Sequence, residues 1–246
     1  MTRTFQYILG IRFFTGDFEG LLESCASHFV VVPSAPTLVE LVADPAYREA
    51  MEQSDFAITD SAFMVMLWKI FTGQSLTRIS GLKLLRGLLA DAKVKTPGAS
   101  FWVMPSAAEM EINLTWLNAH GFSVTCNDCY VAPLYPSGQL TDLELLQCVK
   151  QRQPRYILIN IGGGVQERLG HYLRKHLPDS PAIICVGAAI AFITGLQANI
   201  PVWADAYGLG WFLRCLQAPG KFIPRYWKAL RLVVILARYR ERSVAG

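Results

Sequence analysis

Asp60 and a glycine-rich segment at 162–167 carry residue types that could do chemistry, and each directly follows an apolar run. A carboxylate such as Asp60 can act as a general base, because it accepts the proton of an attacking hydroxyl. The alternative is that Asp60 caps the helix that follows, a role worth about 1 kcal/mol. Its position alone leaves both roles open.

The glycine-rich segment reads Gly-Gly-Gly-Val-Gln-Glu. Glycines let the backbone approach a phosphate, and a helix N-terminus behind them supplies amide donors and partial positive charge. The dinucleotide fingerprint G-x-G-x-x-G fits only in part, because Glu167 stands where its third glycine belongs. An ordinary tight turn, with Glu167 favoured by the helix dipole, is the simpler alternative. A nicotinamide-dependent oxidoreductase is an alternative hypothesis, against which Glu167 argues.

Arg78 lies in a polar segment ahead of a predicted helix, where its planar guanidinium could bind a phosphate or a carboxylate. Taken alone, the position fits a simple surface arginine better, because arginines are mostly exposed. Cys126 and Cys129 form one C-x-x-C pair, but the chain has no second Cys or His pair with the spacing of a zinc site. The chain also lacks a D-x-D pair that would hold a metal with a nucleotide diphosphate. We therefore expect reduced thiols, no metal and no cofactor.

The elements that must position these residues follow an α/β pattern. Strands are predicted at 29–32, 56–59, 100–104, 122–126, 156–161 and 182–186. Helices are predicted at 37–53, 62–71, 81–93, 107–119, 141–152, 165–177 and 188–196. Continuous apolar strands that alternate with helices predict a doubly wound, mostly parallel, Rossmann-like sheet covered on both faces. Ligands of such sheets bind beyond the carboxyl ends of the strands, which selects Ser34, Asp60, Asp128, the glycine-rich segment and Gly187.

Composition excludes other classes of protein. The chain has 246 residues, of which 17% are charged and 52% hydrophobic, so it is not disordered. The net charge of +4 is uneven, because seven basic residues and one acid fall within 221–246. A near-neutral body is a poor match for a nucleic-acid binder, so we expect no nucleic acid as a partner.

No secretory signal is recognisable at 5–14, and the uncharged run 181–196 is too short to span a bilayer, so we expect a cytoplasmic protein.

The basic tail predicts one amphipathic helix over 225–241, opened by Pro224. Tyr226, Leu230, Val233 and Ala237 fall on one stripe of this helix. A basic amphipathic helix with Trp and Tyr suits the bilayer interface, whereas the alternative is a packing helix with a solvated edge. We expect membrane contact through four residues: Trp227, Lys228, Arg231 and Arg238.

Several segments together resemble the WecG/TagA/CpsF glycosyltransferase family over about residues 29–230. They are Asp-Phe-Ala-Ile-Thr-Asp at 55–60, Thr-Arg-Ile-Ser-Gly at 77–81, Gly162 with Gln166 and Glu167, Val-Gly-Ala-Ala at 186–189, and Gly-Leu-Gly-Trp-Phe-Leu-Arg at 208–214, followed by Pro219 and Arg225-Tyr226. Each segment is unspecific alone, but their order and spacing are typical of the family.

The resemblance implies an inverting, metal-independent hexosyl- or N-acetylhexosaminyltransferase. Its donor would be a nucleotide diphosphate sugar, typically UDP-linked, and its acceptor a polyprenyl-diphosphate-linked saccharide. Such an enzyme works in cell-surface or exopolysaccharide biosynthesis, peripheral on the inner face of the bacterial plasma membrane. The resemblance also allows a homo-oligomer.

The resemblance further implies that Asp60, the general base, and Gln166 are catalytic. The substrate-binding residues would be Ser34, Arg78, Gly162, Gly163, Glu167, Gly187, Arg214 and Arg225. Residues 1–203 would form the catalytic domain. Residues 204–246 would form a basic helical appendage that closes over the donor diphosphate and touches the membrane, and excluding water in this way limits donor hydrolysis.

The chain departs from the family pattern in four segments. Gly164 replaces the proline of the family's Gly-x-Pro-x-Gln-Glu, and Gly210 replaces the glutamate of its Leu-Glu-Trp. Pro33-Ser34-Ala35-Pro36 replaces the family's Thr-x-Asn-Pro, and Ala191 replaces an aspartate. We interpret these changes as a divergent subgroup with altered donor or acceptor choice. The alternative is a catalytically inactive relative that binds a nucleotide sugar or a lipid.

Overall fold

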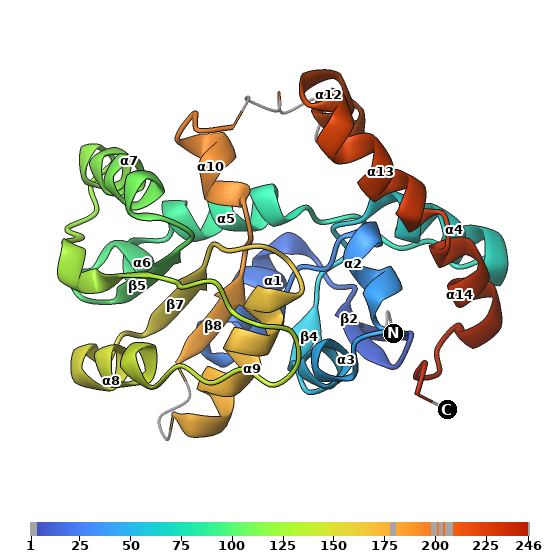
Figure 1. Cartoon of the computed structure of the whole chain (residues 1–246), viewed down its shortest axis with the longest axis horizontal. Coiled ribbons are helices and arrows are strands. Elements are labelled where there is room, and N and C mark those ends of the chain that lie inside the picture. Colours follow the sequence, from blue (N-terminus) through green and yellow to red (C-terminus); the bar gives the residue numbers. More distant parts are fainter. Residues whose placement is uncertain (1–3, 178–180, 198–200, 202–203, 205–208, 246) are drawn as a thin grey trace.

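The computed structural model describes residues 4–177, 181–197, 201, 204 and 209–245, so Gly208 of the family motif lies outside the described residues. Its centre is one eight-stranded sheet in the order β1-β2-β4-β3-β8-β7-β5-β6 (Figure 1). The strands are β1 (Phe5–Ile8), β2 (Ile11–Phe14), β3 (Phe29–Val31), β4 (Phe56–Ala57), β5 (Ser100–Met104), β6 (Cys129–Val131), β7 (Tyr156–Ile159) and β8 (Ala182–Cys185). Neighbouring strands run parallel except in the hairpin β1–β2. The predicted doubly wound α/β fold is confirmed.

Helices cover both faces of the sheet, which explains why its strands are continuously apolar. In β3, Phe29 and Val31 belong to one buried cluster and Val30 to the other. The first cluster includes side chains from α2 (Ala35–Glu40), α3 (Pro45–Glu52), α8 (Leu143–Arg152) and α9 (Val165–His176). The second includes side chains from α1 (Phe18–Ser24), α5 (Gly81–Ala90), α6 (Ala92–Lys95) and α7 (Ala107–Ala119).

The chain reverses its winding direction between β3 and β8. From β3 it continues to β4 on one side, whereas β8 is reached from β7 on the other side. The helix after β3, α2, packs on one face, while α10 (Ala189–Ile193), which follows β8, packs against α5 and α7 on the other face. Loops that diverge at such a switch point leave the crevice in which open α/β sheets bind ligands.

The hairpin β1–β2 is an element that the sequence analysis missed. Leu9 and Gly10 both have positive φ angles, 53° and 81°, as a two-residue hairpin turn requires. The hairpin also anchors the C-terminal segment, because the Leu9 amide donates to the Arg240 carbonyl (2.6 Å) and the Gly10 amide to that of Glu241 (3.1 Å). In the sequence, the signal for this hairpin is Gly10, which stands between two short apolar runs.

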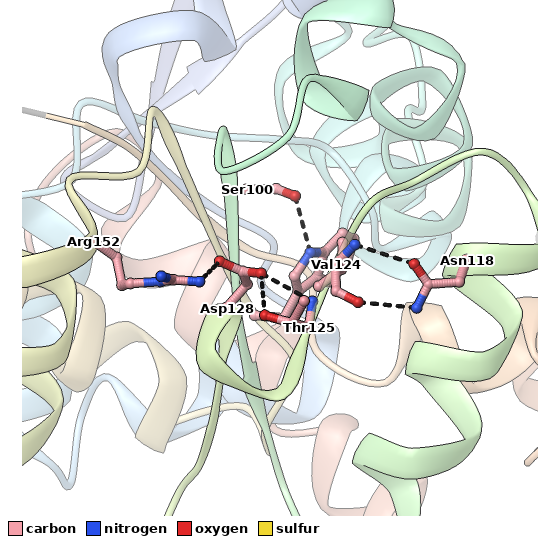
Figure 2. A network of polar contacts seen from close by, with 7 residues as sticks. Ser100, Asn118, Val124, Thr125, Asp128 and Arg152 are labelled. Atoms are coloured by element: carbon pink, nitrogen blue, oxygen red, sulfur yellow. Dashed lines mark hydrogen bonds and ion pairs between the residues drawn. The ribbon is translucent and has the colours of Figure 1, made fainter.

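The strand predicted at 122–126 is wrong, because the edge strand β6 begins at Cys129. The Asn118 side chain binds both the N–H and the C=O of Val124, at 3.1 and 2.9 Å, and so takes the place of a neighbouring strand (Figure 2). Thr125 then opens a 3₁₀ turn over Cys126–Asp128. Asp128 therefore precedes β6, whereas the sequence predicted that it follows a strand. Its carboxylate accepts hydrogen bonds from the amide and hydroxyl of Thr125 and forms an ion pair with Arg152, so it is engaged within the protein.

Three predicted helices are divided. The segment 81–93 breaks at Asp91, which ends α5 and caps α6. The segment 37–53 forms α2 and α3, because Asp44 caps a new helix whose first residue is Pro45. The tail forms α12 (Gly210–Gln217), α13 (Pro219–Ala229) and α14 (Leu232–Tyr239), with Pro224 inside α13, so the single helix over 225–241 is wrong.

The last tail helix is part of the main core. Leu232 and Leu236 of α14 are buried in the same cluster as Phe29 and Val31, and α14 packs against α2 and α4 (Ala62–Thr72). In Figure 1 the tail helices run along the end of the molecule opposite α7 and α8. Among the described residues, none of the helices has the length and apolar character needed to cross a membrane.

Candidate functional site

Asp60 is held at the end of β4 by the segment 77–81. The Thr59 hydroxyl donates to the Thr77 carbonyl (2.6 Å) and accepts from the Ile79 amide (3.2 Å), which ties the two segments together. Asp60 Oδ1 accepts from the amide of Gly81, the first residue of α5, at 2.9 Å. The partial positive charge of that helix N-terminus stabilises a carboxylate.

The alternative interpretation, in which Asp60 caps the helix that follows it, is wrong. Ser61 caps α4, since its hydroxyl accepts from the Met64 amide at 3.2 Å. Arg78 is half-buried beside Asp60, and its Nε donates to the Asp60 carbonyl at 2.7 Å. The structure therefore brings together two residues that the sequence placed 18 positions apart.

The glycine-rich loop after β7 lies against the segment that follows β3. A Cβ at Gly163 would come within 2.9 Å of Thr37 Cγ2, in the first turn of α2. Ser34 precedes that turn, and its amide donates to Thr37 Oγ1 at 3.0 Å. A Cβ at the exposed Gly162 would meet no described heavy atom within 4 Å. Packing within the chain does not require a glycine there, whereas the close approach of a ligand would.

Gln166 and Glu167 are buried behind this loop. Gln166 Oε1 accepts from the Gly187 amide (2.8 Å), and its Nε2 donates to Glu167 Oε1 (3.0 Å). Glu167 Oε2 accepts from the Gly164 amide at 2.6 Å. Burial raises the pKa of the Glu167 carboxyl, although these hydrogen bonds and the neighbouring Arg168 oppose the shift.

Arg214 reaches the same side of the molecule from α12. Its guanidinium carbon lies 4.7 Å from the centre of the Phe192 ring on α10. Phe192 packs with Leu82, the second residue of α5, in a small apolar cluster. Arg214 Nε is buried and has no hydrogen-bond partner among the described residues. Arg225 is exposed on α13, and no residue in the described part of the chain forms an ion pair with it or connects it to Asp60.

The predicted membrane residues occupy different environments. Trp227, Arg231 and Arg238 are exposed, whereas Lys228 forms an ion pair with Glu40 of α2. The predicted apolar stripe is shifted, because Tyr226 and Val233 are half-buried. The exposed apolar stripe of the tail instead comprises Ile223, Trp227, Leu230 and Val234. Their spacing of four, three and four residues places them on one helical face, since Leu230 and Arg231 keep helical dihedrals.

Among the described residues, no three His, Cys, Asp or Glu side chains gather in a way that could hold a metal ion. Burial raises the pKa of the Cys129 thiol to about 12, which keeps it protonated at neutral pH. The C-x-x-C pair therefore belongs to the edge-strand turn.

The arrangement combines a carboxylate at a strand end with arginines and an exposed glycine loop around the switch point. Such a site can take a proton and can bind an anion. The sequence matches the model of the glycosyl transferase WecG/TagA/CpsF family over residues 6–245. No curated protein matches the chain.

Proposed function

Since the chain belongs to the WecG/TagA/CpsF glycosyltransferase family, we propose that it moves a sugar from a UDP-linked donor to a polyprenyl-diphosphate-linked saccharide. In this proposal the reaction is a direct displacement with inversion. The Asp60 carboxylate takes the proton of an acceptor hydroxyl, and the hydroxyl oxygen bonds to the anomeric carbon. The bond from that carbon to the phosphate oxygen breaks, and UDP leaves with the electron pair.

The position of Asp60 is the observation that carries this proposal. Asp60 follows a strand end near the switch point, where ligands of this sheet type bind. Its Oδ1 faces the amide end of α5, and the Arg78 guanidinium lies on its backbone carbonyl. An ionised carboxylate at this position could accept the proton of an acceptor hydroxyl.

Cationic and amide groups around the switch point suit a donor diphosphate. Arg214 carries a buried Nε–H with no partner among the described residues, and Arg78 adjoins Asp60. Gly162 leaves space beside its backbone for a phosphate. We propose that Ser34, Gly163 and Gly187 line the crevice at the switch point. Arg225 would contribute a further positive charge from the appendage, residues 204–246. These cations would neutralise the leaving diphosphate without a metal.

The exposed stripe of α13 and α14 suits a lipid-linked acceptor. Ile223, Trp227, Leu230 and Val234 are apolar and exposed, and the exposed Arg225, Arg231 and Arg238 lie on the same two helices. Apolar side chains with neighbouring cations bind the interface of an anionic membrane. The proposed location is therefore the inner face of the plasma membrane, where cell-surface polysaccharides are assembled.

A donor screen tests the proposal. The purified chain is mixed with a polyprenyl-diphosphate-linked saccharide and with each of several UDP-hexoses and UDP-N-acetylhexosamines, in the presence of EDTA. The expected result is an acceptor whose mass increases by one sugar residue, with UDP released. If UDP binds but no donor gives transfer, the chain is an inactive binding relative, as the changes at Pro33, Ala35 and Ala191 would allow.

A further inference from the structure

The first turn of α9 contains three consecutive polar residues that are almost fully buried. The exposed fractions of Gln166, Glu167 and Arg168, here called the loop anchor, are 3%, 0% and 8%. Buried polar and charged groups are costly unless they are hydrogen-bonded, so their contacts specify a geometry closely. The loop anchor makes such contacts to the loops that follow three different strands.

Glu167 and Arg168 bind the backbone of Gly164 on both of its sides, in two successive peptide groups. Glu167 Oε2 accepts from the Gly164 N–H at 2.6 Å, and Arg168 Nε donates to the Gly164 C=O at 3.0 Å. Arg168 Nη1 also donates to the carbonyls of Pro136 and Gly138, at 3.1 and 2.5 Å, in the loop between β6 and α8. These bonds fix the glycine-rich loop to α9 and to the loop between β6 and α8.

Gln166 extends this connection to the loop after β8. Its Nε2 donates to Glu167 Oε1, which orients the side-chain amide so that Oε1 faces the Gly187 N–H. Gly187 has a φ of 59°, a left-handed conformation that favours glycine. A continuous series of hydrogen bonds, Gly164–Glu167–Gln166–Gly187, therefore links the loops after β7 and β8, beside the switch point.

We infer that Gln166 and Glu167 are positioning residues, and that Gln166 acts on the donor through the Gly187 loop instead of touching the sugar itself. The catalytic part of this inference rests on the proposed glycosyl transfer. The amide oxygen of Gln166 is already bound by a backbone donor, and its nitrogen by a carboxylate. Glu167 would also position these loops, because it is fully buried and cannot reach a substrate.

The hydrogen-bond pattern suggests a decisive pair of variants. In Glu167→Gln, the new amide must face two donors, the Gly164 N–H and Gln166 Nε2, so one buried N–H loses its acceptor. Flipping Gln166 only moves the conflict to Gly187. In the exchanged double variant Gln166→Glu/Glu167→Gln, the carboxylate at 166 accepts from Gly187 and from the new amide. That amide accepts from Gly164, and every bond of the series is restored.

Two readouts test the inference, with Glu144→Gln as a matched control, because Glu144 is an exposed glutamate in the first turn of α8. The first readout is the hydrogen-exchange protection of the Gly164 and Gly187 amides, measured by NMR. Protection should fall on the order of tenfold or more in Glu167→Gln and return in the double variant. Thermal unfolding of each variant shows whether it is folded.

The second readout is sugar transfer. We expect transfer to fall on the order of tenfold or more in Glu167→Gln and to recover to within a few-fold of wild type in the double variant. A folded double variant that regains amide protection but not transfer would show that the Gln166 amide contacts substrate, and would overturn the inference. Unchanged protection in Glu167→Gln would overturn it as well. If wild type transfers no sugar, the proposed function fails, while the exchange measurement still decides whether the two residues position the loops.

Discussion

The apolar stripe of the tail leads to a quantitative prediction about membrane binding. Ile223, Trp227 and Val234 have exposed fractions of 53%, 75% and 69%. Complete burial of such a side chain is worth about 1.5–3 kcal/mol, so entry into lipid should yield about 1–2 kcal/mol for each of the three. Replacing all three by serine should therefore cost about 4 kcal/mol, or weaken binding to anionic vesicles about a thousandfold.

Vesicle sedimentation with phosphatidylglycerol-containing liposomes measures this loss. Leu134→Ser is the matched control, because Leu134 is fully exposed in the loop between β6 and α8, outside the tail. It should bind vesicles as wild type does. A triple variant within about threefold of wild-type affinity would refute the assignment, as would an equal loss in the control. Deleting the tail is a poorer test, because Leu232 and Leu236 belong to the main core.

Three further predictions concern single groups. Arg214→Gln should weaken UDP binding about tenfold by calorimetry, because it removes a buried charged donor; unchanged affinity would exclude Arg214 from the donor site. Gln166→Glu places a second carboxylate beside Glu167, so one of the two should keep a proton at a raised pKa. Transfer relative to wild type should then be highest at low pH and fall as pH rises, and a ratio independent of pH would contradict this. For Asp128, burial alone would raise the carboxyl pKa, but hydrogen bonds from Thr125 and Arg152 lower it, so its stabilisation should be present at neutral pH and disappear as pH falls through the folded pKa. Asp128→Asn should cost about 1–2 kcal/mol in urea unfolding at pH 7 and progressively less below about pH 4, whereas a pH-independent difference would argue against the ion pair.

The sequence predicts the central sheet well because both of its faces are buried. Strands such as β7 are then continuously apolar, and their ends point to Asp60 and to the glycine-rich loop without any knowledge of contacts. The edge of the sheet is harder to predict. Val124 lies in an apolar run, but the Asn118 side chain binds its backbone and replaces the neighbouring strand.

Local sequence patterns also do not reveal which polar side chains form hydrogen bonds within the protein and are therefore not free to bind a substrate. Glu167 looked like a helix-end carboxylate or a ligand for substrate, yet it is fully buried and binds Gly164 and Gln166. Likewise, the contact between Asp60 and Gly81 joins residues 21 positions apart, and no periodicity predicts it. Helical spacing in the tail gave a stripe that included Tyr226, whereas tertiary packing half-buries that residue and leaves Trp227 outside.

The most direct measurement of the central claim is the transfer rate of Asp60→Asn. The asparagine oxygen can still accept from the Gly81 amide, so the fold and UDP affinity should be retained while the proton acceptor is lost. We expect kcat to fall by about 10²–10⁴. Asp17→Asn makes the same change at the N-cap of α1, where asparagine also caps well, and should transfer as wild type does. A folded Asp60→Asn variant that transfers sugar within about tenfold of wild type would contradict the assignment of Asp60 as the general base.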